Sequence, residues 1–259
     1  MRHIPRLHIS DHIDAQSDLR LSSDQSHYLR RVMRLEEGAR IRVFNGRDGE
    51  WSAQVRVTGK SVSLTPLEQL RVQKNVPNLT LLFAPLKKAR TDYAVEKATE
   101  LGVARLQPVL TEYTQTNRIR TDRLGLLAIE AAEQTERLDI PEIYELQRLS
   151  AVLSAWDNSI PLYYCDEAQS QTQDWPARNA SEPAAAGILI GPEGGFSPQE
   201  RVHLRALEFV IPITLGPRIL RAETAIVSAL TLWQSKLGDW HLPPYLPVEE
   251  TAQQARAQG

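Results

Sequence analysis

The first part of the chain has the alternating pattern of half-buried β-strands. Apolar and polar residues alternate there in short runs, which is the period of a strand with one face in a core. The expected strands are residues 3–9, 41–44, 51–57 and 61–67. Residues 45–49 predict the turn of a hairpin, and residues 23–33 predict a helix capped by Ser22 or Ser23. We therefore expect a small β-rich domain over residues 1–72.

Beyond residue 78 the pattern changes to buried strands that alternate with helices. Residues 79–84 are a continuous apolar run, which is typical of a strand covered on both faces. Further strands are expected at 105–110, 161–165, 187–190 and 209–215, and helices at 89–101, 122–137, 222–237 and from Ser197 onward. This alternation predicts an α/β domain with a mainly parallel sheet over residues 73–240. Residues 241–259 show no periodicity, and we expect a flexible tail there.

One polar residue interrupts the apolar face of the helix expected at 122–137. Leu124, Leu127, Ala128 and Ala131 follow the helical spacing of a buried stripe. Gln134 falls on the same stripe. We interpret it as a buried amide with satisfied hydrogen bonds, and a role in a functional site is the alternative.

The composition is that of a globular protein without a membrane span. Of the 259 residues 42% are hydrophobic and 24% charged, which are ordinary values for a globular domain. No apolar run approaches the roughly 20 residues that cross a bilayer, and MRHIPRLHIS lacks the apolar stretch of a signal peptide. The single cysteine, Cys165, excludes an internal disulfide and a cysteine-based zinc site. It fits a reducing cytoplasm.

Basic residues are concentrated in the first 72 residues. This segment carries 12 Lys and Arg against 9 Asp and Glu, although the whole chain has a net charge of −2. Arginine binds phosphates and stacks on bases, so the basic side chains are candidates for RNA contact, with a solvated charged helix as the alternative for residues 30–34. The candidates are Arg2, Arg6, Arg30, Arg31 and Arg34, joined by Lys87, Lys88 and Arg90 after the strand at 79–84.

Two glycine-rich loops follow predicted strands. Residues 188–200 read ILIGPEGGFSPQE, and residues 215–225 read LGPRILRAETA. Ligands of parallel α/β sheets bind at the carboxyl ends of the strands. The first loop lacks the lysine of a phosphate-binding loop and the spacing of a dinucleotide fingerprint, and Glu193 would repel a phosphate. The pattern favours a ligand with positive charge or hydroxyl groups, such as S-adenosylmethionine. A tight turn without a ligand is the alternative.

The second loop leads into a helix whose start carries three polar residues. A carboxylate in the first turn, as at Glu223, is stabilised by the helix dipole, and Thr224 fits the same capping arrangement. Arg221 lies at the unfavourable end of that dipole, so we expect it to have a partner elsewhere.

These motifs resemble a known family of RNA-modifying enzymes. GPEGGFSPQE and LGPRILRAETA, with LKKARTDYAVEKATELGV at 86–103 and EAAEQ at 130–134, closely resemble the 16S rRNA uridine-N3 methyltransferases, the RsmE family of the SPOUT class. Residues 27–51 resemble the PUA-like RNA-binding domain of that family. The family usually has Cys-Gly after the EQ of the helix motif, where this chain has Thr135-Glu136, and we expect this difference to alter only local packing.

The resemblance implies a fold, a cofactor and an assembly. It implies a trefoil-knotted SPOUT domain with a mainly parallel sheet, a small N-terminal PUA-like β-barrel, S-adenosylmethionine as methyl donor, and a homodimer that acts on the small ribosomal subunit without a metal. We expect Arg221, Glu193 and Glu223 to be catalytic and the helix at 222–237 to form much of the dimer interface. The expected cofactor contacts are Cys165, Glu167, Ile190, Gly191, Pro192, Gly194, Gly195, Leu215, Gly216, Arg218, Ile219, Leu220 and Thr224.

Two other classes of function stay open at this point. A PUA-containing assembly factor without catalysis would not need both loops with Glu193 and Arg221. A methyltransferase acting on a small molecule would leave the basic N-terminal domain without a purpose.

Overall fold

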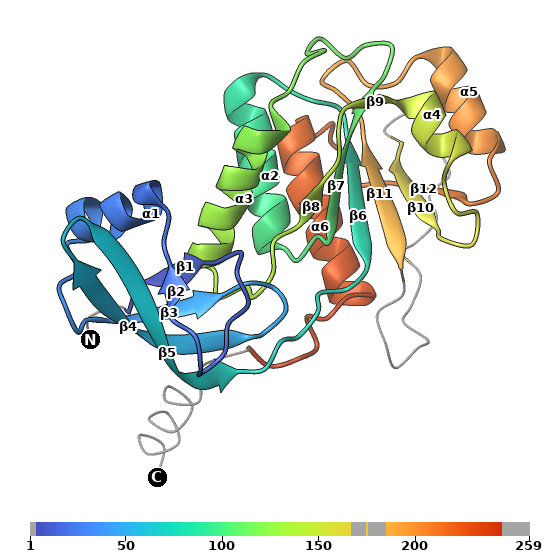
Figure 1. The fold of residues 1–259 in the computed structure, drawn as a ribbon. Helices are drawn as coiled ribbons and strands as arrows, with labels where there is room; N and C mark the ends of the chain where they lie inside the picture. The colour runs from blue at the N-terminus through green and yellow to red at the C-terminus, as the bar shows by residue number, and fades with distance from the viewer. Residues whose placement is uncertain (1–3, 167–174, 176–184, 245–259) are drawn as a thin grey trace. The chain divides into compact units, whose positions relative to one another are not determined.

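A computed structural model describes residues 4–166, 175 and 185–244, and these residues form two compact units (Figure 1). Unit 1 contains Met1–Asn75, Ala132–Ile140 and Pro244–Gly259. Unit 2 contains Val76–Ala131 and Pro141–Pro243. The segment 132–140 therefore belongs to the N-terminal unit, although it lies far away in sequence.

Unit 1 is built on a curled sheet that has five strands among the described residues, in the order β1-β3-β4-β5-β2. The strands are β1 Arg6–His8, β2 Leu19–Arg20, β3 Arg40–Phe44, β4 Glu50–Thr58 and β5 Ser61–Arg71. The antiparallel pairing of β3, β4 and β5 confirms the predicted meander, while β1 pairs with β3 in parallel. The inward positions of all five strands contribute to one apolar core, which includes Ile41, Val55 and Leu64.

The hairpin turn between β3 and β4 is stabilised by side-chain hydrogen bonds of Asn45 and by the backbone conformation of Gly49. The Asn45 side-chain oxygen accepts the backbone N–H groups of Arg47 (3.0 Å) and Asp48 (2.8 Å), which is the usual role of Asn in turns. Gly49 has φ +74°, and a Cβ there would lie 2.1 Å from the carbonyl oxygen of Arg71. A residue with a side chain would therefore force the strands apart.

The predicted helix near residue 23 is confirmed with an irregular second half. Ser22 caps α1 (Ser23–His27) through a capping box with Gln25. The chain continues as the π-helical stretch η1 (Tyr28–Val32), and Arg34 then takes a left-handed φ of +53°.

Unit 2 contains a sheet of seven strands within the described residues, and every pairing in it is parallel. The order is β12-β10-β11-β6-β7-β8, and β9 also pairs with β7. The strands are β6 Leu79–Phe83, β7 Arg105–Leu110, β8 Glu142–Ile143, β9 Gln147–Arg148, β10 Leu162–Cys165, β11 Ala186–Ile190 and β12 Val210–Ile213. The central strands β6 and β11 are buried along their whole length, as expected for a sheet covered on both faces.

Helices cover both faces of this sheet (Figure 1). They are α2 Lys88–Glu100, α3 Thr121–Gln134, α4 Leu149–Ser154, α5 Pro198–Ala206 and α6 Ala222–Lys236. On one face α6 packs against α2 and β11. On the other face α4 and α5 pack on a core that includes Leu82 and Leu189. No helix among the described residues is long and apolar enough to cross a bilayer.

The apolar stripe of α6 is buried within the chain, and the expected part of this helix in a dimer interface stays a prediction. The side chains of Ile226, Leu230 and Trp233 are fully buried against the other elements of unit 2. A stripe that is already part of the core cannot also present these side chains to a second copy.

Helix α3 ends at Gln134, three residues before the expected end. Glu136 takes a left-handed φ of +61°, a conformation that no α-helix can continue through. Gln134 is exposed in this chain, so the expectation of a buried amide is wrong. Ala131 and Ala132 of the same turn are buried, while Gln134 lies on the solvent-exposed side of this turn.

Candidate functional site

The two glycine-rich loops and the end of β10 meet at one edge of the unit 2 sheet. β10 lies between β11 and β12 and runs parallel to both. The carboxyl ends of neighbouring parallel strands reach the same edge, which is where α/β proteins bind ligands. The segments that leave this edge begin after Cys165, Ile190 and Ile213.

Adjoining cavities lie between these segments. The larger has a volume of about 450 Å³ and is lined by Cys165, Asp166, Ile213, Thr214, Leu215, Gly216, Pro217, Arg218, Ile219 and Leu220. The smaller has a volume of about 200 Å³ and is lined by Tyr164, Cys165, Asp166, Ile190, Gly191, Pro192, Glu193, Gly195, Phe196, Arg201, Ile219, Leu220, Arg221 and Ala222. Four of these residues line both cavities, so the cavities adjoin, and we call the two together the recess.

Most of the expected cofactor contacts line this recess, and two of those that the structure describes do not. Gly194 lies against Tyr113, since a Cβ on Gly194 would be 3.3 Å from the Cβ of Tyr113. Thr224 is exposed in the first turn of α6 and lines neither cavity. Glu167 lies outside the described residues. Gly194 therefore faces the exposed side chain of Tyr113, and its expected contact with the cofactor stays a prediction.

Asp166 lines the recess, as its place between the expected contacts Cys165 and Glu167 after a predicted strand indicated. It follows β10 directly and is only 1% exposed, yet it lines both cavities. Its Oδ2 accepts a hydrogen bond of 2.7 Å from Nε of Arg205 in α5. The neighbouring Cys165 is a neutral thiol, because desolvation raises its pKa.

Arg221 is placed at the smaller cavity without an internal partner. It is the N-cap residue of α6, with φ −65° and ψ 150°, and its side chain makes no capping hydrogen bond. It is exposed, and it forms no ion pair with any residue that the structure describes. An arginine beside a helix N-terminus is electrostatically unfavourable, so this position favours an external anionic partner.

The two carboxylates proposed from the sequence are joined by one arginine. Nη1 of Arg90 in α2 lies 3.0 Å from Oε1 of Glu193, and Nε lies 3.4 Å from Oε1 of Glu223. Glu193 lines the smaller cavity, whereas Glu223 does not. The Oε2 atom of Glu223 is buried and has no hydrogen-bond partner among the described residues. The carboxylate of Glu193 therefore lies at the cavity wall, and that of Glu223 lies behind the wall.

The basic residues of the first helical segment surround a separate cavity in unit 1. This cavity, of about 430 Å³, is lined by Leu21, Ser23, Ser26, His27, Arg30, Arg31, Lys60 and Ser61. Nη1 of Arg30 donates to the carbonyl oxygen of Gly59 at 2.7 Å, which fixes this guanidinium on the rim. Arg34 is exposed but does not line the cavity, and Arg2 lies outside the described residues.

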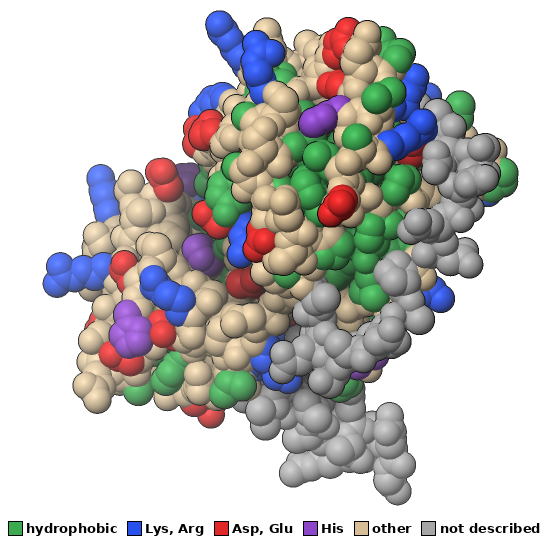
Figure 2. Space-filling view, turned by 90° about the vertical axis from the view of Figure 1, so that its right-hand side faces the viewer, with side chains coloured by type: hydrophobic (Ala, Val, Ile, Leu, Met, Phe, Trp, Pro, Cys, Tyr) green, Lys and Arg blue, Asp and Glu red, His purple; other side chains and the backbone are tan. Residues whose placement is uncertain are grey.

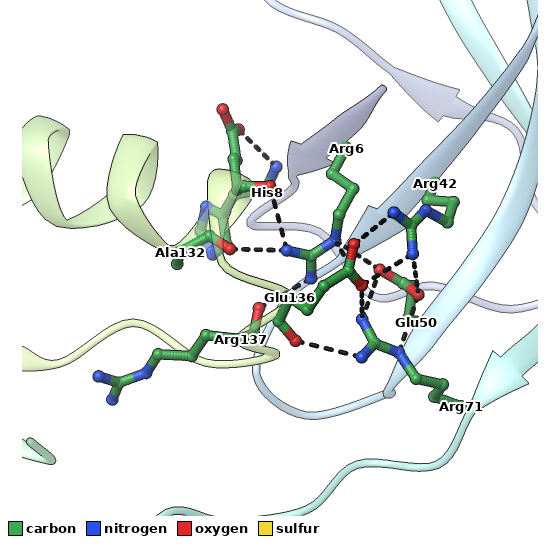
Figure 3. A network of polar contacts seen from close by, with 9 residues as sticks. Arg6, His8, Arg42, Glu50, Arg71, Ala132, Glu136 and Arg137 are labelled. Carbon is green, nitrogen blue, oxygen red and sulfur yellow. Dashed lines mark hydrogen bonds and ion pairs between the residues drawn. The ribbon is translucent and has the colours of Figure 1, made fainter. Parts of the chain in front are cut away.

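Arg6 does not lie on the surface, which corrects its expected contact with RNA. Its side chain is fully buried, and Nε donates to Oε1 of Glu50 at 2.7 Å. The remaining nitrogens donate to the carbonyl oxygens of Ala132 (2.6 Å) and Arg137 (2.8 Å) (Figure 3). A guanidinium whose donors are used internally is not available to a phosphate. Arg6 instead binds the end of α3 to the sheet of unit 1.

The same network continues through Arg42, Arg71 and Glu136 (Figure 3). Arg71 donates to both Glu50 and Glu136 at 2.9 Å, and Arg42 donates to Glu136 at 2.8 Å. Burial raises the pKa of Glu136, but the hydrogen bond from Arg42 and the charges of the three arginines outweigh it. The pKa of this carboxyl is therefore held below its ordinary value of 4.5.

Comparison with known families identifies two regions of the chain. Residues 73–234 match the RNA methyltransferase domain, and residues 21–67 match the RNA methyltransferase PUA domain. The ribosomal RNA small subunit methyltransferase E of Rickettsia conorii is 33% identical over 227 residues, which cover 87% of this chain and 93% of the relative. The protein of the same name from Synechocystis is 30% identical over 83% of this chain and 72% of the relative.

Solved structures share the fold over nearly the whole chain. The ribosomal RNA small subunit methyltransferase E of Neisseria gonorrhoeae, solved with S-adenosyl methionine bound, has a TM-score of 0.82 at 26% identity, covering 92% of this chain and 100% of that chain. A Legionella pneumophila protein solved with the same cofactor has a TM-score of 0.80 at 30% identity, covering 92% and 99%. The PUA and parallel-sheet parts of the predicted fold class are thereby confirmed.

Proposed function

Since this chain belongs to the family of ribosomal RNA small subunit methyltransferase E, we propose that it methylates N3 of a uridine in 16S rRNA with S-adenosylmethionine. The observation that carries the proposal is the recess formed by both glycine-rich loops and the end of β10. The named relatives are enzymes, which favours a catalytic protein over an assembly factor without catalysis.

The residues around the recess fit S-adenosylmethionine. Ile213, Ile219 and Leu220 offer apolar surface for an adenine ring. Asp166 and Glu193 offer carboxylates for an ammonium, a sulfonium or ribose hydroxyls. The cofactor supplies a methyl group bound to a sulfonium sulfur. When the methyl group is transferred, the rest of the cofactor leaves as a neutral thioether. We propose Cys165, Ile190, Gly191, Pro192, Gly195, Leu215, Gly216 and Arg218 as further contacts.

The chain itself must handle the proton and the charge of the uracil ring. N3 becomes nucleophilic when its proton leaves, and negative charge then spreads to the ring oxygens. We propose that Glu193, at the cavity wall, accepts this proton. Arg221, exposed at the same cavity, stabilises the charge on a ring oxygen. Glu223 lies behind the wall, and its proposed role is to hold Arg90, which in turn orients Glu193.

We assign RNA binding and methyl transfer to different domains of the chain. We propose an RNA-binding domain over residues 1–72, a methyltransferase domain over 73–240 and a tail over 241–259. Arg30 and Arg31 lie on the rim of a cavity, where they are available to phosphates. Lys87 and Lys88 are exposed at the start of α2 in unit 2.

We also infer a cytoplasmic homodimer with a trefoil knot in the methyltransferase domain. Figure 2 shows hydrophobic side chains side by side on the face of unit 2 that carries α4 and α5, a feature typical of interaction surfaces. Ile219, which lines the recess, is 84% exposed, so a second copy could complete the wall there. Sedimentation at micromolar concentration tests the dimer, and a monomer would refute it.

Methyl transfer to small ribosomal subunits tests the proposed function. Subunits from a bacterial strain without its own enzyme of this family are incubated with the protein and labelled cofactor, and the 16S rRNA is mapped by mass. We expect one N3-methyluridine. Methylation at another atom or of another RNA would overturn the assignment.

The role of Arg221 is tested in single turnovers on the same subunits. Arg221→Ala should lower the rate at saturating RNA by about 10²-fold or more, the scale of one lost preorganised group. Cofactor affinity should stay unchanged in calorimetry. A variant that regains the full rate at saturating RNA would make Arg221 a binding residue.

A further inference from the structure

A groove in unit 2, separate from the recess, joins basic and apolar side chains. It has a volume of about 390 Å³, and it is lined by Leu86, Lys88, Thr91, Asp92, Thr116, Arg118, Ile119, Arg120, Arg123 and Leu124. These residues come from the segment after β6, the start of α2, the loop after β7 and the start of α3. We call this feature the α2–α3 groove.

Sheet topology places the α2–α3 groove at the same edge as the recess. β6 lies between β11 and β7, and all three strands are parallel. The segments after β6 and β7, which form the groove, therefore leave the sheet on the same side as the loop at 191–195. The ion pair between Arg90 in α2 and Glu193 in that loop links the two features directly.

The groove is held open by hydrogen bonds to one strand end. The carbonyl oxygen of Leu86 accepts from the hydroxyls of Thr91 (3.0 Å) and Thr116 (3.2 Å). Thr116 thereby fixes the loop after β7 to the end of β6. A groove that is already formed avoids the entropy cost of ordering its loops when a ligand binds.

Ion pairs neutralise part of the charge in the groove and leave two cations. Arg123 donates to Asp92 at 2.7 Å, and Arg120 pairs with Asp122 at 2.6 Å. Arg118 and Lys88 are exposed, and neither has a carboxylate partner among the described residues. The groove therefore presents two uncompensated positive charges to solvent.

The apolar part of the groove distinguishes its ligand from a simple anion. Ile119 is half-buried and presents apolar surface to the groove, and the almost fully buried Leu86 and Leu124 form the apolar base behind it. Free phosphate would use the cations but not these side chains. A nucleotide within a strand has a phosphate for the cations and a ribose or base for the apolar surface.

We propose that the α2–α3 groove binds a single-stranded nucleotide of the RNA substrate next to the target uridine. Arg118 and Lys88 contact the phosphates, and the apolar surface accepts the ribose or base. The proposal rests on the proposed function, because it requires an RNA whose target base enters the recess at the same edge. It adds a binding site on the methyltransferase unit to the one at Arg30 and Arg31.

Salt-dependent binding of the full-length protein to unmodified small ribosomal subunits tests the proposal. Each lost phosphate contact with a single strand lowers the slope of log Kd against log salt by about 0.7, and weakens binding by about three- to tenfold near 0.1 M salt. We expect this change for Arg118→Ala and for Lys88→Ala. Lys236→Ala is the control, because it removes one exposed positive charge of unit 2 in the last turn of α6, outside the groove.

The outcomes separate this inference from the proposed function. If the wild-type protein methylates the subunits while Arg118→Ala keeps the wild-type salt slope, the groove is not an RNA site and the proposed function stands. An equal loss in Lys236→Ala and Arg118→Ala would also overturn the groove, since a general charge effect would then explain both. If the wild-type protein methylates no RNA, the proposed function itself fails. Calorimetry with S-adenosylmethionine should give the wild-type affinity for all three variants.

Discussion

Arg90 and Glu193 form an ion pair across 103 residues of sequence, with 3.0 Å between Nη1 and Oε1. The same guanidinium reaches Glu223 through Nε at 3.4 Å. One arginine thereby connects the start of α2 with the loop after β11 and the first turn of α6. The orientation of the carboxylate at the cavity wall depends on a side chain that does not line the cavity.

Loss of Arg90 should slow methyl transfer without weakening the binding of the cofactor. Arg90→Ala frees Glu193 to rotate, and we expect a rate lower by about 10²-fold at saturating RNA, with an unchanged Kd for S-adenosylmethionine. Single-turnover kinetics and calorimetry measure the two quantities. Lys97→Ala is the matched control, because Lys97 also joins two carboxylates of α2, Glu96 and Glu100, away from the recess. Equal rates for Arg90→Ala and the wild type would contradict the positioning role.

Gly216 should matter for cofactor affinity through its backbone conformation. Its φ of +98° is in the region that side chains disfavour, although a Cβ there would meet no atom within 4 Å. In Gly216→Ala we expect the loop to move to a backbone conformation that alanine tolerates. If the conformation that binds the cofactor then costs about 1.4 kcal/mol, the Kd for S-adenosylmethionine rises tenfold. Gly59→Ala is the control, since Gly59 has φ +63° and equally open surroundings in a turn of unit 1. Calorimetry should show wild-type affinity for the control, and an unaltered Kd in Gly216→Ala would refute the loop assignment.

Removal of the Glu50 carboxylate should destabilise the protein strongly. Glu50 is fully buried between Arg6 and Arg71, so Glu50→Gln leaves buried guanidinium groups without their counter-charge. We expect a loss of about 3–5 kcal/mol in the free energy of unfolding, as for other broken buried pairs. Urea denaturation measures it, with the exposed Glu68→Gln in β5 as the control. A loss as small as that of the control would show that Glu50 carries little of this stability.

Glu136 should make stability depend on pH in acid. Its pKa is lower in the folded than in the unfolded chain, so the ionised carboxylate stabilises the fold at neutral pH. This contribution should decline as the pH falls below 4.5 and through the folded-state pKa. The urea midpoint followed against pH should fall less steeply for Glu136→Gln than for the wild type. Parallel curves for the two proteins would exclude Glu136 as a source of the acid dependence.

The organisation of the chain follows from local sequence. The alternating runs before residue 72 and the strand–helix alternation after residue 78 predicted both sheets, because burial on one or two faces imposes a period on apolar residues. The two-residue strands β2, β8 and β9 were missed, since they are too short to show a period. The loops at 191–195 and 215–220 could be placed together because the ends of neighbouring parallel strands meet at one edge.

The partners of charged side chains were decided only by the tertiary structure. Arg6 lies in a basic segment and looked like an RNA contact, but its guanidinium is buried against Glu50 and the end of α3. Glu136 has a left-handed backbone just after α3, and Arg42 and Arg71 are bound to its carboxylate. A local pattern records whether a position faces a core or solvent. It contains no information about which distant charge is brought within hydrogen-bond distance, because that pairing is set by the packing of whole elements.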